Sequence, residues 1–277
     1  MKTIHLIILL SISLFQALTA IGYGQNANPN TSQNAMQNQS QNKDIMNSKK
    51  ALIVVTNHSD FNHPKADPTG LWLSELTHFY DVFEEAGIPV QIVSIKGGKI
   101  PVDGRSLKSI VLDKATKARY EDPKFMALLE HTKSISDIEA KDYSLIFFAG
   151  GHGAMWDFKN HKELQNLTRE MYEDGKLVSA VCHGLAALQN VKLSNGEYLI
   201  NGKKGTGFPY FDESVSGVKR FVPYNLEKTL KERGMIYSKA FFPMGKHIVV
   251  DGQLITGQNP NSTTKTAEMA LELLLQL

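Results

Sequence analysis

The residues from Ala180 to Gly184 contain the side chains most capable of covalent chemistry. Cys182 is the only cysteine of the 277-residue chain, and His183 follows it directly. Ala180 lies two residues before the cysteine and Gly184 two residues after it. A sharp turn from a strand into a helix requires small residues at these spacings, because larger side chains would collide with neighbouring backbone. The pattern therefore favours a nucleophilic cysteine over one that only fills the core.

The same turn predicts an acidic thiol at Cys182. A helix that starts at the turn directs its free N–H groups toward the side chain at the tip, and these groups favour an anion. A neighbouring histidine such as His183 acts in the same direction. We therefore expect the pKa of the Cys182 thiol to lie below that of a free cysteine.

Strands and helices alternate around this turn. Short apolar runs predict buried strands at residues 51–55, 90–95, 145–149 and 177–181. Apolar residues at helical spacing predict helices at residues 71–86 and 162–173, with shorter helices at 114–120 and 123–131 that form a cap beside the site. The expected fold class is therefore α/β, with a mostly parallel sheet sandwiched by helices and a small cap insertion. Ligands of such sheets bind at the carboxyl ends of the strands.

The last third of the chain predicts two hairpins and two further helices. A glycine-bounded hairpin and strand is expected at residues 198–208, followed by the acids Asp212 and Glu213 in a loop. A second hairpin is expected at 248–257, with Asp-Gly at its turn. The helices are expected at residues 223–234 and 263–275.

Other polar residues fall near the predicted carboxyl edge of the sheet. Glu75 lies on the apolar face of the helix at 71–86, and a carboxyl group there needs a partner, which favours a place in the site. His152 lies in a glycine turn after the strand at 145–149, where it either caps its own loop or contacts a ligand. The other histidines show no ligand spacing, so no required metal is predicted.

The amino-terminal 48 residues differ in composition from the rest. Residues 1–24 predict a signal peptide, with Lys2 before an apolar stretch that is too short for a comfortable membrane span. Residues 25–48 are rich in Asn and Gln and predict a disordered spacer. We therefore expect a periplasmic or secreted protein with no membrane attachment after cleavage and one domain at residues 49–277. The net charge of +2 gives no reason to expect nucleic-acid binding.

Four motifs, in order along the chain, resemble the ThiJ/PfpI superfamily, which has the flavodoxin-like fold of class I glutamine amidotransferases. They are residues 149–153 (AGGHG), 180–184 (AVCHG), 206–208 (TGF) with Glu213, and 256–260 (TGQNP). The branch they resemble most is that of glyoxalase III and the heat-shock chaperone 31-like proteins. The resemblance covers nearly all of residues 49–277.

The resemblance implies a Cys-His-acid site. Cys182 matches the nucleophile of the family and His183 the histidine that follows it. Glu213 matches the acid that holds this histidine in fungal-type members, and its neighbour Asp212 remains an alternative. Glu75 matches the helix glutamate that forms a hydrogen bond with the cysteine.

The resemblance also implies how a substrate is held. The backbone N–H groups of Gly151 and His183 match the oxyanion hole of the family, and His152 is the candidate for substrate binding. The implied enzyme is of the glyoxalase III type, a lyase of the D-lactate dehydratase class without a cofactor. It converts methylglyoxal-type 2-oxoaldehydes to lactate and similar 2-hydroxy acids without glutathione, as a defence against carbonyl stress. Protein deglycase activity, assigned to relatives, is a further option, as is a homodimer.

Three other functions are weighed against this one. A stress-responsive holding chaperone or redox sensor stays open as the main alternative, because relatives hold unfolded proteins and a reactive thiol oxidises readily. Glutamine amidotransfer is disfavoured: its His-x-Glu motif should follow the cysteine, whereas His161-Lys162-Glu163 precedes Cys182. Cysteine peptidase activity is also disfavoured, because fold alone does not carry function.

Overall fold

The computed structural model describes residues 49–277. The predicted signal peptide and the Asn/Gln-rich spacer lie outside the described residues. None of the helices within residues 49–277 combines the length and the apolar character that a membrane crossing demands.

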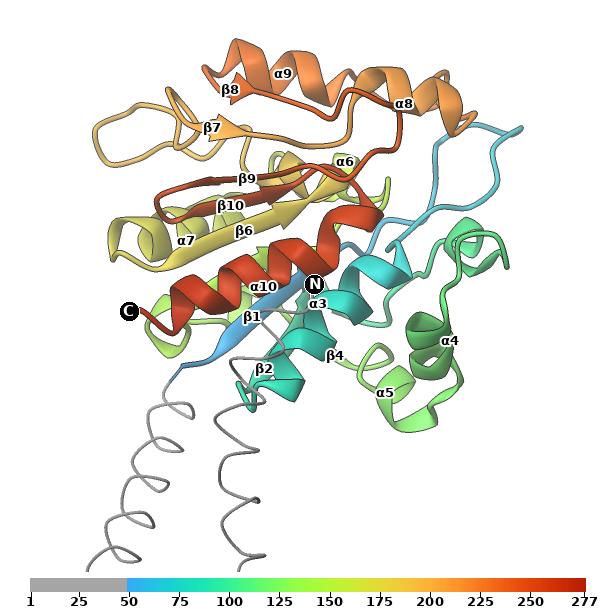
Figure 1. Ribbon diagram of the computed structural model, residues 1–277, viewed down its shortest axis with the longest axis horizontal. Helices are drawn as coiled ribbons and strands as arrows, with labels where there is room; N and C mark the ends of the chain where they lie inside the picture. The colour runs from blue at the N-terminus through green and yellow to red at the C-terminus, as the bar shows by residue number, and fades with distance from the viewer. Residues whose placement is uncertain (1–48) are drawn as a thin grey trace, which may run out of the picture. The chain divides into compact units, whose positions relative to one another are not determined.

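Eight strands form one sheet in the order β3-β4-β2-β1-β5-β6-β10-β9 (Figure 1). The six inner strands pair in parallel, whereas β3 and β9 pair antiparallel at the two edges. The bounds of the strands are β1 Ala51–Val55, β2 Val90–Ser94, β3 Lys96–Gly98, β4 Thr132–Ser134, β5 Leu145–Phe148, β6 Leu177–Val181, β9 Ile248–Asp251 and β10 Leu254–Gly257. The mostly parallel sheet expected from the sequence is confirmed, but the three-residue strands β3 and β4 were not predicted.

Alternate residues of the central strands enter two hydrophobic cores. Leu52 and Val54 of β1 belong to one core, and Ile53 and Val55 belong to the other. Helices α3 (Leu73–Glu85) and α10 (Thr263–Leu274) cover one face side by side (Figure 1), while α6 (Ala154–Asp157), α7 (Lys162–Glu173) and α9 (Leu226–Glu232) pack on the other. Because side chains alternate across a strand, this arrangement buries both faces of the sheet.

The predicted cap insertion has two parts, one that packs against α3 and one that reaches the carboxyl edge of the sheet. Helix α4 (Lys114–Glu121) forms where the sequence predicts it, and α5 (Pro123–Ala127) begins at the predicted residue but ends four residues earlier than predicted. Arg119 of α4 donates to Asp81 of α3 over 2.8 Å and also pairs with Glu84, so this part of the insertion braces α3. The residues before α4, including the 3-10 helix η2 (Gly104–Leu107), reach the carboxyl edge of the sheet instead.

Two predictions about the last third of the chain are wrong. Residues 198–208 do not form a hairpin, because Tyr198 makes only an isolated bridge with Lys192 and β7 (Lys204–Gly205) pairs in parallel with β8 (Ile236–Tyr237). Asp212 and Glu213 lie in helix α8 (Tyr210–Val215) and not in a loop. The hairpin of β9 and β10 is confirmed, with Gly252 at its turn in the left-handed region (φ 59°).

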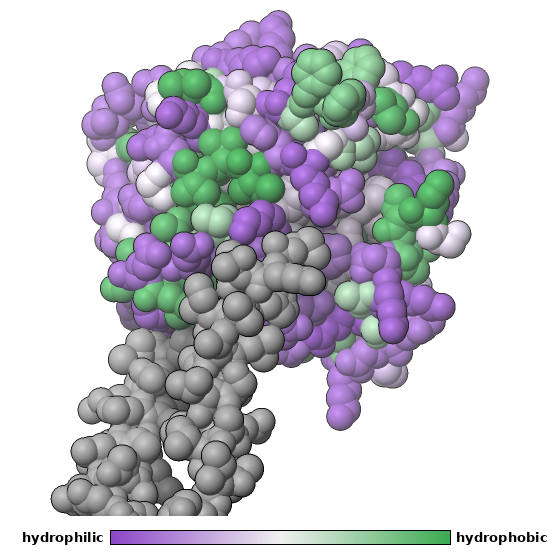
Figure 2. All heavy atoms as spheres, in the orientation of Figure 1, coloured by the Kyte–Doolittle hydropathy of each residue, from purple (hydrophilic) through white to green (hydrophobic). Residues whose placement is uncertain are grey.

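Exposed large apolar side chains lie both in loops and on helices and strands. On the face drawn in Figure 2, hydrophobic residues form separate areas among hydrophilic ones. The most exposed large apolar side chains of the described residues are Phe241 (93%) and Ile110 (90%), and neither lies in a helix or strand.

Candidate active site

The turn from β6 into the 3-10 helix η5 (Cys182–Ala187) places Cys182 at its tip. The cysteine has a left-handed backbone (φ 57°), which costs a residue with a side chain about 1–2 kcal/mol. A Cβ at Gly184 would lie 2.2 Å from the carbonyl oxygen of Phe148. The glycine after the nucleophile is therefore a steric requirement of the neighbouring strand β5.

The glycine turn that follows β5 packs against this elbow. A Cβ at Gly150 would lie 2.8 Å from the backbone nitrogen of His183 and 2.6 Å from Oε2 of Glu75. Gly151 has a φ of 100°, and a Cβ there would lie 2.2 Å from the carbonyl oxygen of Gly70. Gly151, Cys182 and His183 consequently line one cavity, where the predicted oxyanion hole would have to form.

Cys182, His183 and Glu213 form a hydrogen-bonded row in the buried interior. Sγ of Cys182 lies 3.2 Å from Nδ1 of His183, and Nε2 of His183 lies 2.7 Å from Oε1 of Glu213. Burial acts to raise the pKa of Glu213, but His183 and His152 outweigh burial and hold that pKa far below its ordinary value. A carboxylate only accepts hydrogen bonds, so Nε2 of His183 carries a proton and Nδ1 is free to accept one from the thiol.

Of the two adjacent acids, only Glu213 contacts the histidine. Oδ2 of Asp212 accepts a hydrogen bond of 3.0 Å from the backbone nitrogen of Met244. Asp212 is therefore committed to the loop that follows β8, and the structure gives no contact between it and His183.

His152 supports the same carboxylate from its other side. Its Nε2 lies 2.9 Å from Oε2 of Glu213, and its Nδ1 lies 3.2 Å from Nη2 of Arg105, which can only donate. Burial lowers the pKa of His152 to about 4, and a positive charge on His183 acts in the same direction once it forms, so the ring of His152 is neutral and Nε2 is the donor. Asp103 fixes Arg105 by accepting from its Nε over 2.9 Å. His152 lines the cavity as expected of a substrate-binding residue, but both ring nitrogens already have protein partners.

Sequence reasoning missed Asp103 and Arg105. They lie between the strands β3 and β4 in a segment without hydrophobic periodicity, where nothing local marks a charged residue as part of a site. Only the close approach of residues 103–105 to the Gly150 turn reveals their role.

Glu75 is the second carboxyl group of the site, and it is in the opposite protonation state. It is fully buried on α3, and its Oε2 accepts a hydrogen bond of 2.7 Å from the backbone nitrogen of Gly150. Burial raises its pKa to about 8, against hydrogen bonds from Cys182 and Gly150 that lower it. The other carboxyl oxygen, Oε1, is buried and forms no hydrogen bond of normal geometry with the described residues. At neutral pH, Glu75 is thus a neutral acid beside the nucleophile.

The prediction of an acidic thiol is wrong. Burial raises the pKa of the Cys182 thiol well above its ordinary value, and the charges of an ionised Glu75 and of Glu213 raise it further, while the N–H of His183 lowers it. The expected helix dipole is also small, because η5 is a six-residue 3-10 helix and not a long α-helix. The proton must therefore leave the thiol by transfer to Nδ1 of His183.

The cavity above the cysteine has a volume of about 280 Å³. Its walls come from the glycine turn, the elbow, η2 with the residues after it, α8 and the start of the last helical segment. The lining residues are Trp72, Arg105, Lys108, Val111, Gly151, His152, Cys182, His183, Phe208, Val215, Ser216, Met244 and Pro260. Glu75 is not among them and lies behind the cysteine, fully buried on α3.

The residues His152, His183 and Glu213 could also be considered as metal ligands, because one ligand atom of each lies within 4.8 Å of the others. Each Nε2 already forms a hydrogen bond with a Glu213 oxygen, at 2.9 and 2.7 Å. A metal ion would need nitrogen ligands at about 2.0–2.1 Å and would replace both bonds. The observed contacts are those of a hydrogen-bonded triad.

The chain is similar to known proteins over most of its described residues. The model of the DJ-1/PfpI family matches residues 69–274. Glyoxalase 3 of Candida albicans is 32% identical over 226 residues, which cover 79% of this chain and 95% of that protein. The glutathione-independent glyoxalase hsp3102 of Schizosaccharomyces pombe is 34% identical over 239 residues, which cover 83% and 99%.

Two crystal structures are similar over the same region. The rapid encystment protein of 24 kDa from Francisella tularensis has 38% identity and a TM-score of 0.77, covering 82% of this chain and 99% of that one. Glyoxalase III from Candida albicans has 31% identity and a TM-score of 0.75, covering 81% and 97%.

The proximity of Glu75 and Cys182 predicts the behaviour of the thiol. Replacing Glu75 by Gln removes the negative charge that raises the thiol pKa, so the pH midpoint of the Cys182 alkylation rate should move to lower pH than in the wild type. Because the chain has one cysteine, iodoacetamide labelling followed by mass spectrometry reports on Cys182 alone. The control Asp212→Asn should leave the midpoint unchanged. An unchanged or higher midpoint in Glu75→Gln would contradict the coupling.

Proposed function

The chain belongs to the DJ-1/PfpI family, in its glyoxalase III branch, and from this premise we propose that it is a cysteine-dependent, glutathione-independent glyoxalase. The substrates are 2-oxoaldehydes of the methylglyoxal type, and the products are 2-hydroxy acids such as lactate. The observation that carries the proposal is the buried, protonated carboxyl of Glu75 beside the Cys-His-Glu row. Moving a proton between two carbons needs a general acid–base group beside the nucleophile, and the carboxyl group of Glu75 is placed to be one.

The first step forms a carbon–sulfur bond. Nδ1 of His183 takes the proton of the Cys182 thiol, and the thiolate attacks the aldehyde carbon of the substrate to give a hemithioacetal. Glu213 stabilises the imidazolium that results, in the role of the acid in a catalytic triad. The N–H groups of Gly151 and His183 are the candidates to bind the oxyanion that develops on the former aldehyde oxygen.

The second step moves a proton from the former aldehyde carbon to the adjacent carbonyl carbon. The ionised form of Glu75 removes the proton from the first carbon to give an enediolate, and the protonated Glu75 returns it to the second carbon. The hydroxyl proton of the first carbon passes to the oxygen of the second carbon. The first carbon is thereby oxidised to a thioester and the second reduced to an alcohol, so no external oxidant or reductant is needed. A pKa of about 8 suits a group that must act as base and then as acid near neutral pH.

The last step hydrolyses the thioester. Water adds to the thioester carbon, the carbon–sulfur bond breaks, and the thiol and the 2-hydroxy acid are released. Neutral His152, held between Arg105 and Glu213, keeps the carboxylate oriented toward His183 during this exchange. We propose in addition that the same site removes glycation from proteins, a reaction that would begin with the same attack by the thiol.

We also propose that the domain is exported. The support is the sequence pattern of residues 1–24, which lie outside the described residues. The full chain, beginning at Met1, is expressed in a bacterial host. Mass spectrometry of the periplasmic fraction should then find a protein whose amino terminus lies near residue 25. Recovery of the chain only in the cytoplasm with Met1 intact would contradict export. The homodimer suggested by the resemblance stays a prediction.

The proposed reaction is tested with methylglyoxal in the absence of glutathione. The wild type should form lactate, whereas Cys182→Ala and Glu75→Gln should each lose at least about 100-fold in rate, the range expected for removal of a nucleophile or of a general acid–base group. Exposed Phe241 and Ile110 make a holding chaperone the second candidate. Suppression of client aggregation that survives in Cys182→Ala, without lactate formation by the wild type, would favour that function and overturn the proposal.

The two adjacent acids of α8 should differ in effect. Glu213→Ala removes the acceptor for both His183 and His152 and should lower kcat by about 100-fold or more, because His183 loses its tautomer and orientation. Asp212→Ala removes only the contact with Met244 and should keep kcat within about threefold while lowering stability by about 1 kcal/mol. Lactate kinetics and urea unfolding measure the two effects. An equal loss of kcat in both variants would refute the assignment.

A further inference from the structure

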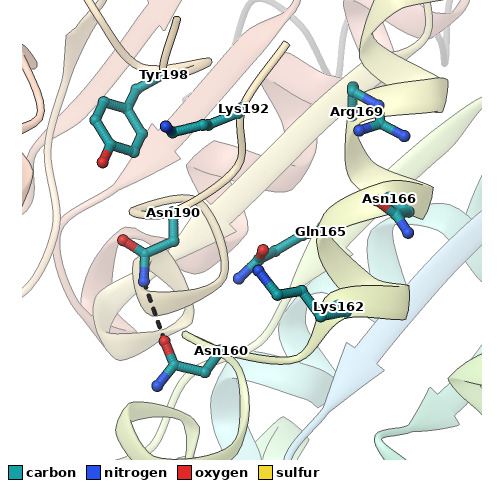
Figure 3. A pocket seen from close by; sticks show the side chains of 8 residues that line it. All are labelled: Asn160, Lys162, Gln165, Asn166, Arg169, Asn190, Lys192 and Tyr198. Atoms are coloured by element: carbon teal, nitrogen blue, oxygen red, sulfur yellow. Dashed lines mark hydrogen bonds between the residues drawn. The ribbon is translucent and has the colours of Figure 1, made fainter. Parts of the chain in front are cut away.

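A second cavity lies away from the cysteine and shares no residue with the active-site cavity. Its volume is about 380 Å³. One wall is a stripe of α7, and the other is the chain that follows η5 (Figure 3). The lining residues are Asn160, Lys162, Gln165, Asn166, Arg169, Asn190, Lys192 and Tyr198. We refer to it as the α7 cavity.

Positive charge in the α7 cavity is not neutralised by its own walls. Lys162, Arg169 and Lys192 line it, and no carboxylate does. None of these three forms an ion pair within 4 Å in the part of the chain that the structure describes. Glu173, one turn beyond Arg169 on α7, does not line the cavity and is held mainly by the backbone nitrogen and the hydroxyl of Ser194, at 2.6 and 2.7 Å. The charge of Arg169 also lowers the pKa of Glu173, but less than these hydrogen bonds do.

One of the three cations contacts an aromatic ring of the cavity. The isolated bridge between Lys192 and Tyr198 places these two residues opposite each other. The ammonium of Lys192 lies 5.4 Å from the centre of the Tyr198 ring. The guanidinium of Arg233, which does not line the cavity, lies 4.5 Å from the same ring. Such contacts favour a cation beside the ring, so Tyr198 helps to place Lys192 in the cavity wall.

The floor of the α7 cavity offers one hydrogen-bond acceptor without a protein donor. Gln165 is more than nine-tenths buried, and its Nε2 donates to the carbonyl oxygen of Lys159 over 2.8 Å. That bond fixes the orientation of the amide, and its Oε1 has no partner among the described residues. Asn190 is already engaged by Lys159 and Arg233, at 3.0 and 3.3 Å. A ligand that fits would thus carry a hydroxyl for Gln165 as well as negative charge.

We propose that the α7 cavity binds an anionic saccharide, such as a sugar phosphate or a sugar acid. The anionic group lies among Lys162, Arg169 and Lys192, and a sugar hydroxyl donates to Oε1 of Gln165. The side chains of Lys162 and Lys192 are exposed. Because salt screens exposed charges, we expect the affinity for the anionic saccharide to fall as salt is added. The site is separate from the glyoxalase chemistry and does not depend on it.

Titration calorimetry with Cys182→Ala protein tests the proposal, since that variant excludes reaction of open-chain sugar with the thiol. Glucose 6-phosphate and glucuronate distinguish a phosphate from a carboxylate as the anionic group, while glucose and inorganic phosphate each lack one of the two features. We expect binding of at least one anionic sugar, with glucose and inorganic phosphate at least about tenfold weaker. Equal binding of inorganic phosphate, or no binding of either anionic sugar, would overturn the proposal.

Variants then place the binding in the α7 cavity. Lys192→Glu should weaken binding of the anionic sugar by about tenfold or more, since it reverses one charge of the cavity wall. Lys133→Glu makes the same charge change at an exposed position on β4 and should leave binding unchanged. Gln165→Leu should remove the preference for sugar phosphate over inorganic phosphate, and urea unfolding shows whether that variant folds. Equal losses in Lys192→Glu and Lys133→Glu would refute the location.

Discussion

The left-handed backbone at Cys182 is the constraint on which the rest of the site depends. The conformation lifts the sulfur out of β6, but it is compatible with the fold only because Gly184 leaves room for the carbonyl of Phe148. The same close packing brings Gly150 against the backbone of His183 and delivers its N–H to Glu75. Backbone contacts among three elements thus position the nucleophile, the oxyanion-hole candidates and the second carboxyl group together.

Two buried glutamates then acquire opposite protonation states from their surroundings. Glu213 accepts from two imidazoles and stays ionised, whereas Glu75 meets only one backbone N–H and the thiol and keeps its proton up to about pH 8. Carboxyl groups whose pKa values are pushed apart in this way take different chemical roles. Here one orients the histidine and the other is suited to carry a proton.

Features that depend on residues close in the sequence could be predicted, whereas features that depend on contacts between distant segments could not. Helix α7 was predicted at its observed bounds, because apolar side chains at helical spacing mark it within twelve residues. Strands β3 and β4 were missed, since three residues carry no periodicity. The placement of Glu213 in a helix, the contact of Arg105 with His152 and the raised thiol pKa could not be predicted either. Each depends on which distant segments come into contact and on how deeply their residues are buried. The local sequence pattern does not determine either.

The two edge strands limit how this domain can associate with other chains. At β3 the strand is three residues long, and the side chain of Asn57 occupies the Lys96 N–H and the Gly97 carbonyl, at 2.7 and 3.1 Å. At the other edge, β7 lies beside β9, and Asp251 accepts from the Lys204 N–H over 2.7 Å. Short strands and occupied backbone groups deny a foreign strand the template it would extend. Neither edge of the described sheet therefore offers a long row of free backbone groups for a foreign strand to extend.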